Sequence, residues 1–145
     1  MSLFIDTGVF YAQSDRDAHR HPTANEALES VLSSEYGRLY TSDYVFAETV
    51  TLTRKRTGRF EYANRIGDRI LGKGDFPHVI ETITTSEELF QRSIETFERY
   101  DDHDLSFTDA STVALVRSLD IDAVLAFDDD FDGLVSRLDP REVAS

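Results

Sequence analysis

The sequence predicts an α/β fold with a central, mostly parallel sheet flanked by helices. Two short apolar runs, Leu3–Ile5 and Ala123–Phe127, are typical of buried strands. Segments with apolar residues at helical spacing separate the expected strands, and strands that alternate with helices favour a parallel sheet covered on both faces. The chain has 145 residues, of which 40% are hydrophobic, so we expect residues 1–145 to form one domain around a single core.

In the first half of the chain we expect strands at residues 3–5 and 38–41, and helices that begin near Pro22, Asp43 and Phe60. The first helix has Pro at its start and apolar residues at helical spacing from Ala24 to Leu32. Ser42 is expected to cap the second helix, which Gly58 ends, and Gly72 is expected to end the third.

In the second half we expect strands at residues 79–82, 123–127 and 134–138, with one helical turn within 128–133. Two helices are expected to begin at capping boxes, in which an N-cap hydroxyl and an acid three residues later each bind a backbone N–H. The first box pairs Thr85 with Glu88, and the second pairs Ser106 with Asp109.

The composition excludes several classes of protein. The chain contains no Cys, which excludes disulfides and thiolate metal sites. No apolar run approaches the length that spans a bilayer, and no basic segment precedes a long apolar stretch at the start, so we expect a cytoplasmic protein without a membrane partner. The net charge of −13 argues against generic binding of nucleic acids.

The basic side chains are concentrated in residues 54–73, which carry seven bases and only two acids. The bases are Arg54, Lys55, Arg56, Arg59, Arg65, Arg69 and Lys73. This segment could contact RNA through phosphate groups. It could also be a solvated helix face, because Arg65, Arg69 and Lys73 follow one another at helical spacing.

Four acids stand where a carboxylate needs an explanation: Asp6, Glu48, Asp109 and Asp128. Asp6 and Asp128 follow the two apolar runs, and ligand sites of α/β folds lie at the carboxyl ends of such strands. Glu48 shares a helical face with Val45 and Leu52. Because unpaired carboxylates are almost never fully buried, a basic partner or a metal must satisfy Glu48.

Three of these acids also have a purely structural explanation. Asp6 could cap the helix that follows it, Asp109 could serve only its capping box, and most of Asp128–Asp130 could be solvated. If the four acids converge, two carboxylates ~4 Å apart repel by ~4 kcal/mol at an effective dielectric of 20. Such a cluster would take up protons or bind a hard cation such as Mg²⁺ or Mn²⁺, which prefer oxygen ligands.

The four acids lie in four short motifs that together span nearly the whole chain. The motifs are Phe4-Ile5-Asp6-Thr7, Ser42-Asp43-Tyr44-Val45-Phe46-Ala47-Glu48, Leu105-Ser106-Phe107-Thr108-Asp109-Ala110 and Phe127-Asp128-Asp129-Asp130-Phe131. In order and spacing these motifs resemble those of the PIN-domain ribonucleases, and more closely those of the VapC-type toxins of toxin–antitoxin operons. The resemblance implies a three-layer PIN-like domain and a divalent-metal-dependent endoribonuclease, the toxin of a type II toxin–antitoxin pair.

The resemblance also implies roles for individual residues. The implied catalytic residues and ligands of Mg²⁺ or Mn²⁺ are Asp6, Glu48, Asp109 and Asp128. The residues implied to support them are Thr7, Ser42, Asp104 and Asp130. Asp104 is also an alternative to Asp109 as the third acid, and we favour Asp109 because the helix follows it directly. The family often has Thr or Ser two residues before the fourth acid, where this chain has Ala126.

The implied reaction is hydrolysis of an RNA phosphodiester by a metal-activated water, which leaves a 5′-phosphate and a 3′-hydroxyl. The residues expected to contact RNA are Arg54, Arg56 and Arg59. The implied protein partners are a cognate antitoxin and a second copy of the chain in a homodimer.

Other functions remain as alternatives: a PIN nuclease of RNA processing, or a non-catalytic interaction module. A haloacid-dehalogenase-type phosphatase would need an acid two residues after Asp6, where Gly8 stands. A phosphoacceptor receiver domain would need a Lys late in the chain, but the last Lys is Lys73.

Overall fold

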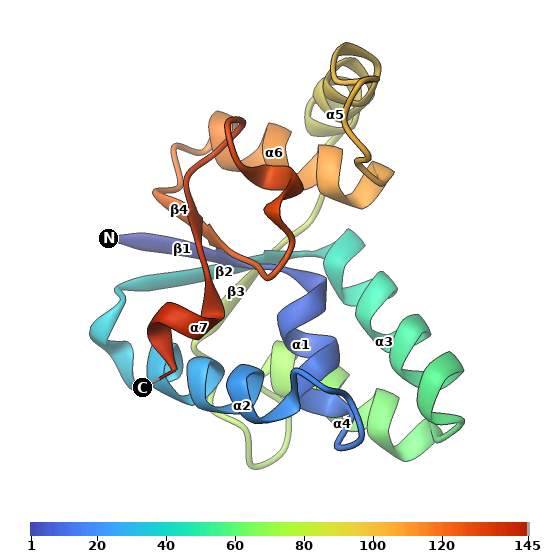
Figure 1. Cartoon of the computed structure of the whole chain (residues 1–145), viewed down its shortest axis with the longest axis vertical. Coiled ribbons are helices and arrows are strands. Elements are labelled where there is room, and N and C mark those ends of the chain that lie inside the picture. The colour runs from blue at the N-terminus through green and yellow to red at the C-terminus, as the bar shows by residue number, and fades with distance from the viewer. Residues whose placement is uncertain (145) are drawn as a thin grey trace.

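A five-stranded parallel sheet forms the centre of the protein, and helices cover both of its faces (Figure 1). The computed structural model describes residues 1–144. The strands are β1 (Ser2–Ile5), β2 (Arg38–Ser42), β3 (Ile80–Ile83), β4 (Ala123–Leu125) and β5 (Arg137–Leu138), in the order β3-β2-β1-β4-β5. The mostly parallel sheet predicted from the sequence is confirmed, and every strand pair within the described residues is parallel.

The central strand β1 pairs with β2 on one side and with β4 on the other. Phe4 lies opposite Tyr40 in β2 and opposite Val124 in β4. Leu3, Phe4 and Ile5 are completely buried, as expected for a strand covered on both faces. The carboxyl ends of β2, β1 and β4 therefore lie side by side at one edge of the sheet.

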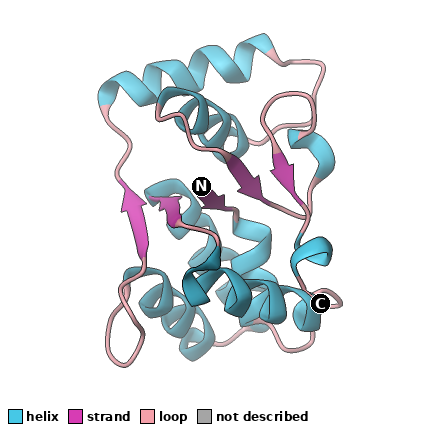
Figure 2. Ribbon diagram, turned by 90° about the vertical axis from the view of Figure 1, so that its left-hand side faces the viewer, coloured by secondary structure: helices cyan, strands magenta, loops and turns pink. Residues whose placement is uncertain are grey.

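The helices form two groups that pack on opposite faces of the sheet (Figure 1, Figure 2). They are α1 (Thr7–Ser14), α2 (His21–Ser30), α3 (Asp43–Thr57), α4 (Phe60–Leu71), α5 (Glu87–Arg99), α6 (Phe107–Ser118) and α7 (Pro140–Val143). A π-helical turn, Val31–Glu35, continues α2, and a 3₁₀ turn, Asp129–Phe131, follows β4. In Figure 1, α5 and α6 lie on one face, while α1, α2, α4 and α7 lie on the other. No helix within residues 1–144 is long and apolar enough to cross a membrane.

One prediction about the helices is wrong, and one helix was left without predicted bounds. The capping box at Thr85 does not form, because Thr85 binds Asp43 at the start of α3 instead. The N–H and the hydroxyl of Thr85 donate to the Asp43 carboxylate at 3.0 and 2.7 Å. Ser86 caps α5 instead and accepts from Leu89 N at 3.2 Å. The helix α1 was expected only as the helix that Asp6 could cap, and its bounds were not predicted, because Thr7, Val9, Phe10 and Ala12 are all buried and leave no amphipathic pattern. The capping box of Ser106 and Asp109 is confirmed.

The burial of the strands gives a direct test of the fold. Leu125→Ala is expected to lower the free energy of unfolding by ~2–5 kcal/mol, because Leu125 is completely buried in the core of β4. Leu119→Ala is the matched control, since this side chain is 48% exposed, and it should change stability by less than ~0.5 kcal/mol. Urea unfolding measures both variants, and equal effects would contradict the described core.

Candidate active site

Two of the four acids extend from neighbouring strands of the sheet. Asp6 directly follows β1, and its N–H donates to the carbonyl of Leu125 in β4 at 3.1 Å. Asp128 follows β4 after Ala126 and Phe127, and its carboxylate accepts from Asp130 N at 2.9 Å. Both acids therefore lie at the same edge of the sheet.

Helix starts bring the other two acids to this edge. Glu48 lies in the second turn of α3, which begins directly after β2, and Ser42 caps this helix by accepting from Val45 N at 3.2 Å. Asp109 lies in the first turn of α6, which packs against α3. Its Oδ2 accepts from Ser106 N at 3.2 Å, and its own N–H donates to Ser106 Oγ at 3.0 Å. These two hydrogen bonds fix the first turn of α6 and hold Asp109 at the sheet edge.

Asp6 is the buried member of the set, with a side chain only 6% exposed. It occupies the N-cap position of α1, yet its side chain makes no capping hydrogen bond. Its Oδ1 is buried and has no hydrogen-bond partner in the described part of the chain. The N–H groups of Thr7 and Gly8 stabilise the ionised carboxylate, but they leave Oδ1 without a partner. An unpartnered buried oxygen costs roughly 1–3 kcal/mol, and more if it is charged.

Electrostatic coupling connects all four carboxylates. Burial is the main cause that raises the pKa of Asp6 to about 8; the charges of Asp109 and Glu48 act in the same direction, and the Thr7 and Gly8 N–H groups oppose them. Burial is also the main cause that raises the pKa of Asp109 to about 6, with contributions from the charges of Asp128 and Glu48. The charges of Asp109 and Glu48 thus act on Asp6, and those of Asp128 and Glu48 act on Asp109, as expected for carboxylates that face a common volume.

The donor set fits a hard divalent cation. All four side chains offer carboxylate oxygens, and Asp6 Oδ1 needs a partner that the protein does not supply. Within residues 1–144, however, only Asp128, Asp129 and Asp130 bring three acidic oxygens within 4.8 Å of one another. Mg²⁺ binds oxygen at ~2.0–2.1 Å, so two oxygens on one ion are at most ~4.2 Å apart. To share one ion directly, the four acids would therefore have to move closer together; otherwise they would hold it partly through water.

The residues implied to support the site differ in their surroundings. Thr7 is buried, and its hydroxyl has no partner among the described residues. The Ser42 hydroxyl is engaged in capping α3. The pKa of Asp130 is raised mainly by partial burial and next by the charge of Asp128. The charge of Asp104 also raises it. Asp104 therefore lies beside the Asp128–Asp130 turn, while Asp109 is coupled to the other three acids.

Aromatic residues, to which the sequence motifs assign no role, also lie at this edge. An open groove beside Glu48 is lined by Tyr44, Thr51 and Phe107, and the Tyr44 and Phe107 ring centroids are 6.0 Å apart. These side chains could stack against nucleobases. Their positions in the sequence are the available signal, because Tyr44 is one helical turn before Glu48 and Phe107 is two residues before Asp109.

The basic segment is divided between two environments. Arg54, Arg56 and Arg59 are exposed, and their guanidinium groups lie over aromatic rings of Phe60, Tyr11 and Tyr62 at 5.3, 4.9 and 5.1 Å. A fully solvated helix face is the wrong description of residues 65–73, because Arg69 is half-buried and Lys73 lies beyond the end of α4.

Known proteins of similar sequence belong to the family that the motifs resemble. The model of the PIN domain family matches residues 3–135. The chain is 29% identical over 129 residues to the 23S rRNA-specific endonuclease VapC20 of Mycobacterium tuberculosis, covering 89% of this chain and 91% of that protein. It is 26% identical over 133 residues to a VapC ribonuclease of Archaeoglobus fulgidus, covering 90% of this chain and 80% of that protein.

Solved structures show the same architecture. The crystal structure of M. tuberculosis VapC20, described as a sarcin–ricin loop cleaving toxin, superposes with a TM-score of 0.75 at 28% identity, over 89% of this chain and 92% of that chain. The crystal structure of FitAcB from Neisseria gonorrhoeae superposes with a TM-score of 0.61 at 17% identity, over 95% of this chain and 97% of that chain. The second likeness supports the fold alone.

The buried carboxylates predict an unusual pH dependence of stability. Because the folded pKa of Asp6 is about 8 against an ordinary 3.8, the folded state binds protons more tightly than the unfolded state. In EDTA, stability should therefore be highest near pH 4 and fall by on the order of a few kcal/mol as the pH rises through 8. Thermal unfolding of Asp6→Asn should show a much smaller fall, whereas the exposed control Asp120→Asn should behave like the parent. Stability that rises from pH 4 to 8 in EDTA would contradict the burial of Asp6.

Proposed function

Since the chain belongs to the PIN domain family, whose model covers residues 3–135, we propose that it is a divalent-metal-dependent endoribonuclease of the VapC type. The observation that carries this proposal is the coupling of four carboxylates around the buried, unpartnered Oδ1 of Asp6. The VapC relatives, two of which are named as an endonuclease and a ribonuclease, support an RNA substrate and the role of toxin in a toxin–antitoxin pair.

We assign the catalytic site to Asp6, Glu48, Asp109 and Asp128. These side chains would hold Mg²⁺, or Mn²⁺ in its place, through oxygen atoms alone. A bound divalent cation would lower the pKa of a water molecule and neutralise charge on the phosphodiester. Thr7, Ser42 and Asp130 would support the ligands, and the coupling of Asp109 with the other acids favours it over Asp104 as the third acid.

The protein orders the segments that carry the acids. Asp6 is fixed by the backbone hydrogen bond to β4, Asp109 by the capping box, and Glu48 by α3, whose start is held by Ser42. Asp43 links the start of α3 to the segment before α5 through Thr85. Carboxylates positioned in advance do not have to be ordered when substrate binds, which lowers the cost of reaching the transition state.

The exposed arginines at the end of α3 and the start of α4 are the proposed RNA contact. Arg56 is eight residues beyond Glu48 on the same helix, which places it roughly 12 Å along the helix axis. The RNA strand would pass from the carboxylates along α3 to Arg54, Arg56 and Arg59.

The proposed partners are a cognate antitoxin and a second copy of the chain. Apolar side chains that could serve such contacts are exposed on α4 and α5, namely Phe60, Phe90 and Phe97. In α5, Phe90 and Phe97 pack against Phe107 of α6, with ring centroids 5.9 and 5.7 Å apart.

Metal-dependent cleavage is the first test of the function. Purified protein with Mg²⁺ or Mn²⁺ should cut a structured RNA, and EDTA should abolish the cuts. Asp6→Asn should reduce the rate by roughly 100-fold or more, since losing even a supporting partner of a ligand costs roughly 10- to 100-fold. Asp129→Asn, which removes an exposed acid outside the four, should keep most of the activity. Equal cleavage by Asp6→Asn and the parent would indicate a contaminating nuclease and refute the assignment.

The RNA path is tested by replacing Arg54, Arg56 and Arg59 with Ser. The RNA dissociation constant should rise while the melting temperature stays nearly unchanged, because exposed charges contribute little to folding. The slope of log K against log salt concentration should also flatten by ~0.7 for each phosphate that the variant no longer neutralises.

A matched control replaces three exposed arginines outside the basic segment, Arg38, Arg92 and Arg141, and so changes the net charge equally. If the control weakens RNA binding as much as the replacement of Arg54, Arg56 and Arg59 does, only overall charge matters and the proposed path is wrong.

A further inference from the structure

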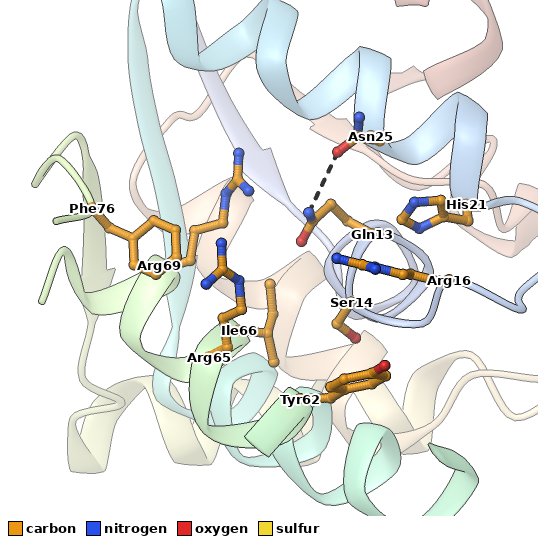
Figure 3. Close-up of a pocket in the computed structure, with 10 residues that line it drawn as sticks. All are labelled: Gln13, Ser14, Arg16, His21, Asn25, Tyr62, Arg65, Ile66, Arg69 and Phe76. Atoms are coloured by element: carbon orange, nitrogen blue, oxygen red, sulfur yellow. Dashed lines mark hydrogen bonds between the residues drawn. The ribbon is translucent and has the colours of Figure 1, made fainter. Parts of the chain in front are cut away.

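A pocket with three arginines lies at the end of α1 far from Asp6, between α1, α2 and α4 (Figure 3). We call it the arginine pocket and define it by Arg16, Arg65 and Arg69. Ile66 forms part of its wall, and no Asp or Glu lines it. This local excess of positive charge is unexpected in a chain with a net charge of −13. The charge of the pocket therefore favours binding of an anion.

Arg69 gives the strongest indication of a missing partner. Its Nε is buried and makes no hydrogen bond within the described residues. Burial lowers the pKa of Arg69, and the neighbouring Arg65 charge lowers it further, while Glu29 on α2 opposes this effect. Glu29 forms no ion pair with Arg69 in residues 1–144, so its compensation acts only at a distance. Two adjacent guanidinium groups that form no ion pair with an acid in the described residues favour a bound anion.

The shape of the pocket favours a phosphate group. Arg65 and Arg69 both lie over the ring of Phe76, at 5.2 and 5.7 Å, which orients their guanidinium groups. In Figure 3, Arg16 lies on the opposite side of the pocket from these two, with Gln13 between them. Gln13 is bonded only weakly, to Asn25 at 3.4 Å, so its amide can turn toward a ligand. Arginine forks on several sides match the tetrahedral oxygens of phosphate.

The position of the pocket relates it to the RNA path. Ser14 lines the pocket and ends α1, which begins after Asp6, so the two sites are roughly 12 Å apart along the helix. Arg59 of the proposed RNA contact lies over Tyr62, which also lines the pocket. We propose that the arginine pocket binds a non-scissile phosphate group of the RNA substrate, an inference that rests on the proposed nuclease function.

The test uses Arg16→Gln with Arg65→Gln, because both side chains are exposed and their replacement should not affect folding. On a long RNA substrate the KM should rise at least roughly tenfold, the change expected for about one charge-assisted hydrogen bond, while kcat stays unchanged. On the shortest RNA that the parent protein cleaves, neither constant should change. Arg38→Gln with Arg99→Gln, two exposed arginines outside the pocket, is the matched control and should resemble the parent on both substrates. An unchanged KM on the long RNA would overturn the proposal.

A second experiment removes the charge from the ligand. Replacing single phosphates of the long RNA with methylphosphonates should identify one non-scissile position that weakens binding in the parent protein but not in the double variant. Binding is measured in EDTA, so the result does not depend on cleavage. If the parent binds RNA through the pocket but never cleaves it, the nuclease proposal fails and the pocket stands.

Titration with inorganic phosphate, followed by NMR, distinguishes a site for small phosphates. If inorganic phosphate fills the pocket at low concentration and no RNA phosphate depends on the arginines, the pocket is a small-anion site and the proposal is wrong. Arg69→Lys, which keeps the charge but removes the fork, should weaken RNA binding less than Arg69→Gln. Equal RNA binding by Arg69→Gln and the parent would also contradict the proposal.

Discussion

The Asp6 carboxylate is held where its ionised form is unfavourable, and this constraint connects the stability of the protein to its function. It is buried at the end of the central strand, Oδ1 lacks a partner in the described residues, and burial raises its pKa to about 8. Glu48 and Asp109 add their charges to the same volume. Without a cation, the site is expected to hold a proton near neutral pH; with one, the same carboxylates become ligands.

The fold tolerates this arrangement because the acids extend from elements that the core holds firmly. The three apolar residues of β1 are completely buried, and β1 pairs with both β2 and β4. The acids at the sheet edge cannot separate without disrupting these pairs. The hydrogen bond between Ser106 and Asp109 fixes the start of α6, and the one between Asp43 and Thr85 fixes the start of α3. The energy that holds the repelling charges together comes from the hydrophobic core and not from the site itself.

Local sequence patterns were sufficient for the parallel sheet and for most helices, because apolar periodicity and capping residues act over a few positions. They failed where a distant residue decided the outcome. Asp43 binds Thr85, which moves the cap of α5 to Ser86. The apolar face expected around Glu48 is also incomplete: Val45 and Thr49 are buried, while Glu48 itself is half-buried at the rim. The arginine pocket could not be predicted, since it joins Arg65 and Arg69 of α4 to Arg16, which is 49 and 53 positions earlier.

The position of a bound ion tests the central claim most directly, because two groups of acids compete for it. Crystals soaked in Mn²⁺ would locate the ion through its anomalous scattering. Our account predicts a peak within ~2.0–2.4 Å of an Asp6 carboxylate oxygen, with Asp109, Glu48 or Asp128 beside it directly or through water. A peak confined to the exposed turn Asp128–Asp130, where three acidic oxygens already lie within 4.8 Å of one another, with none at Asp6, would contradict it.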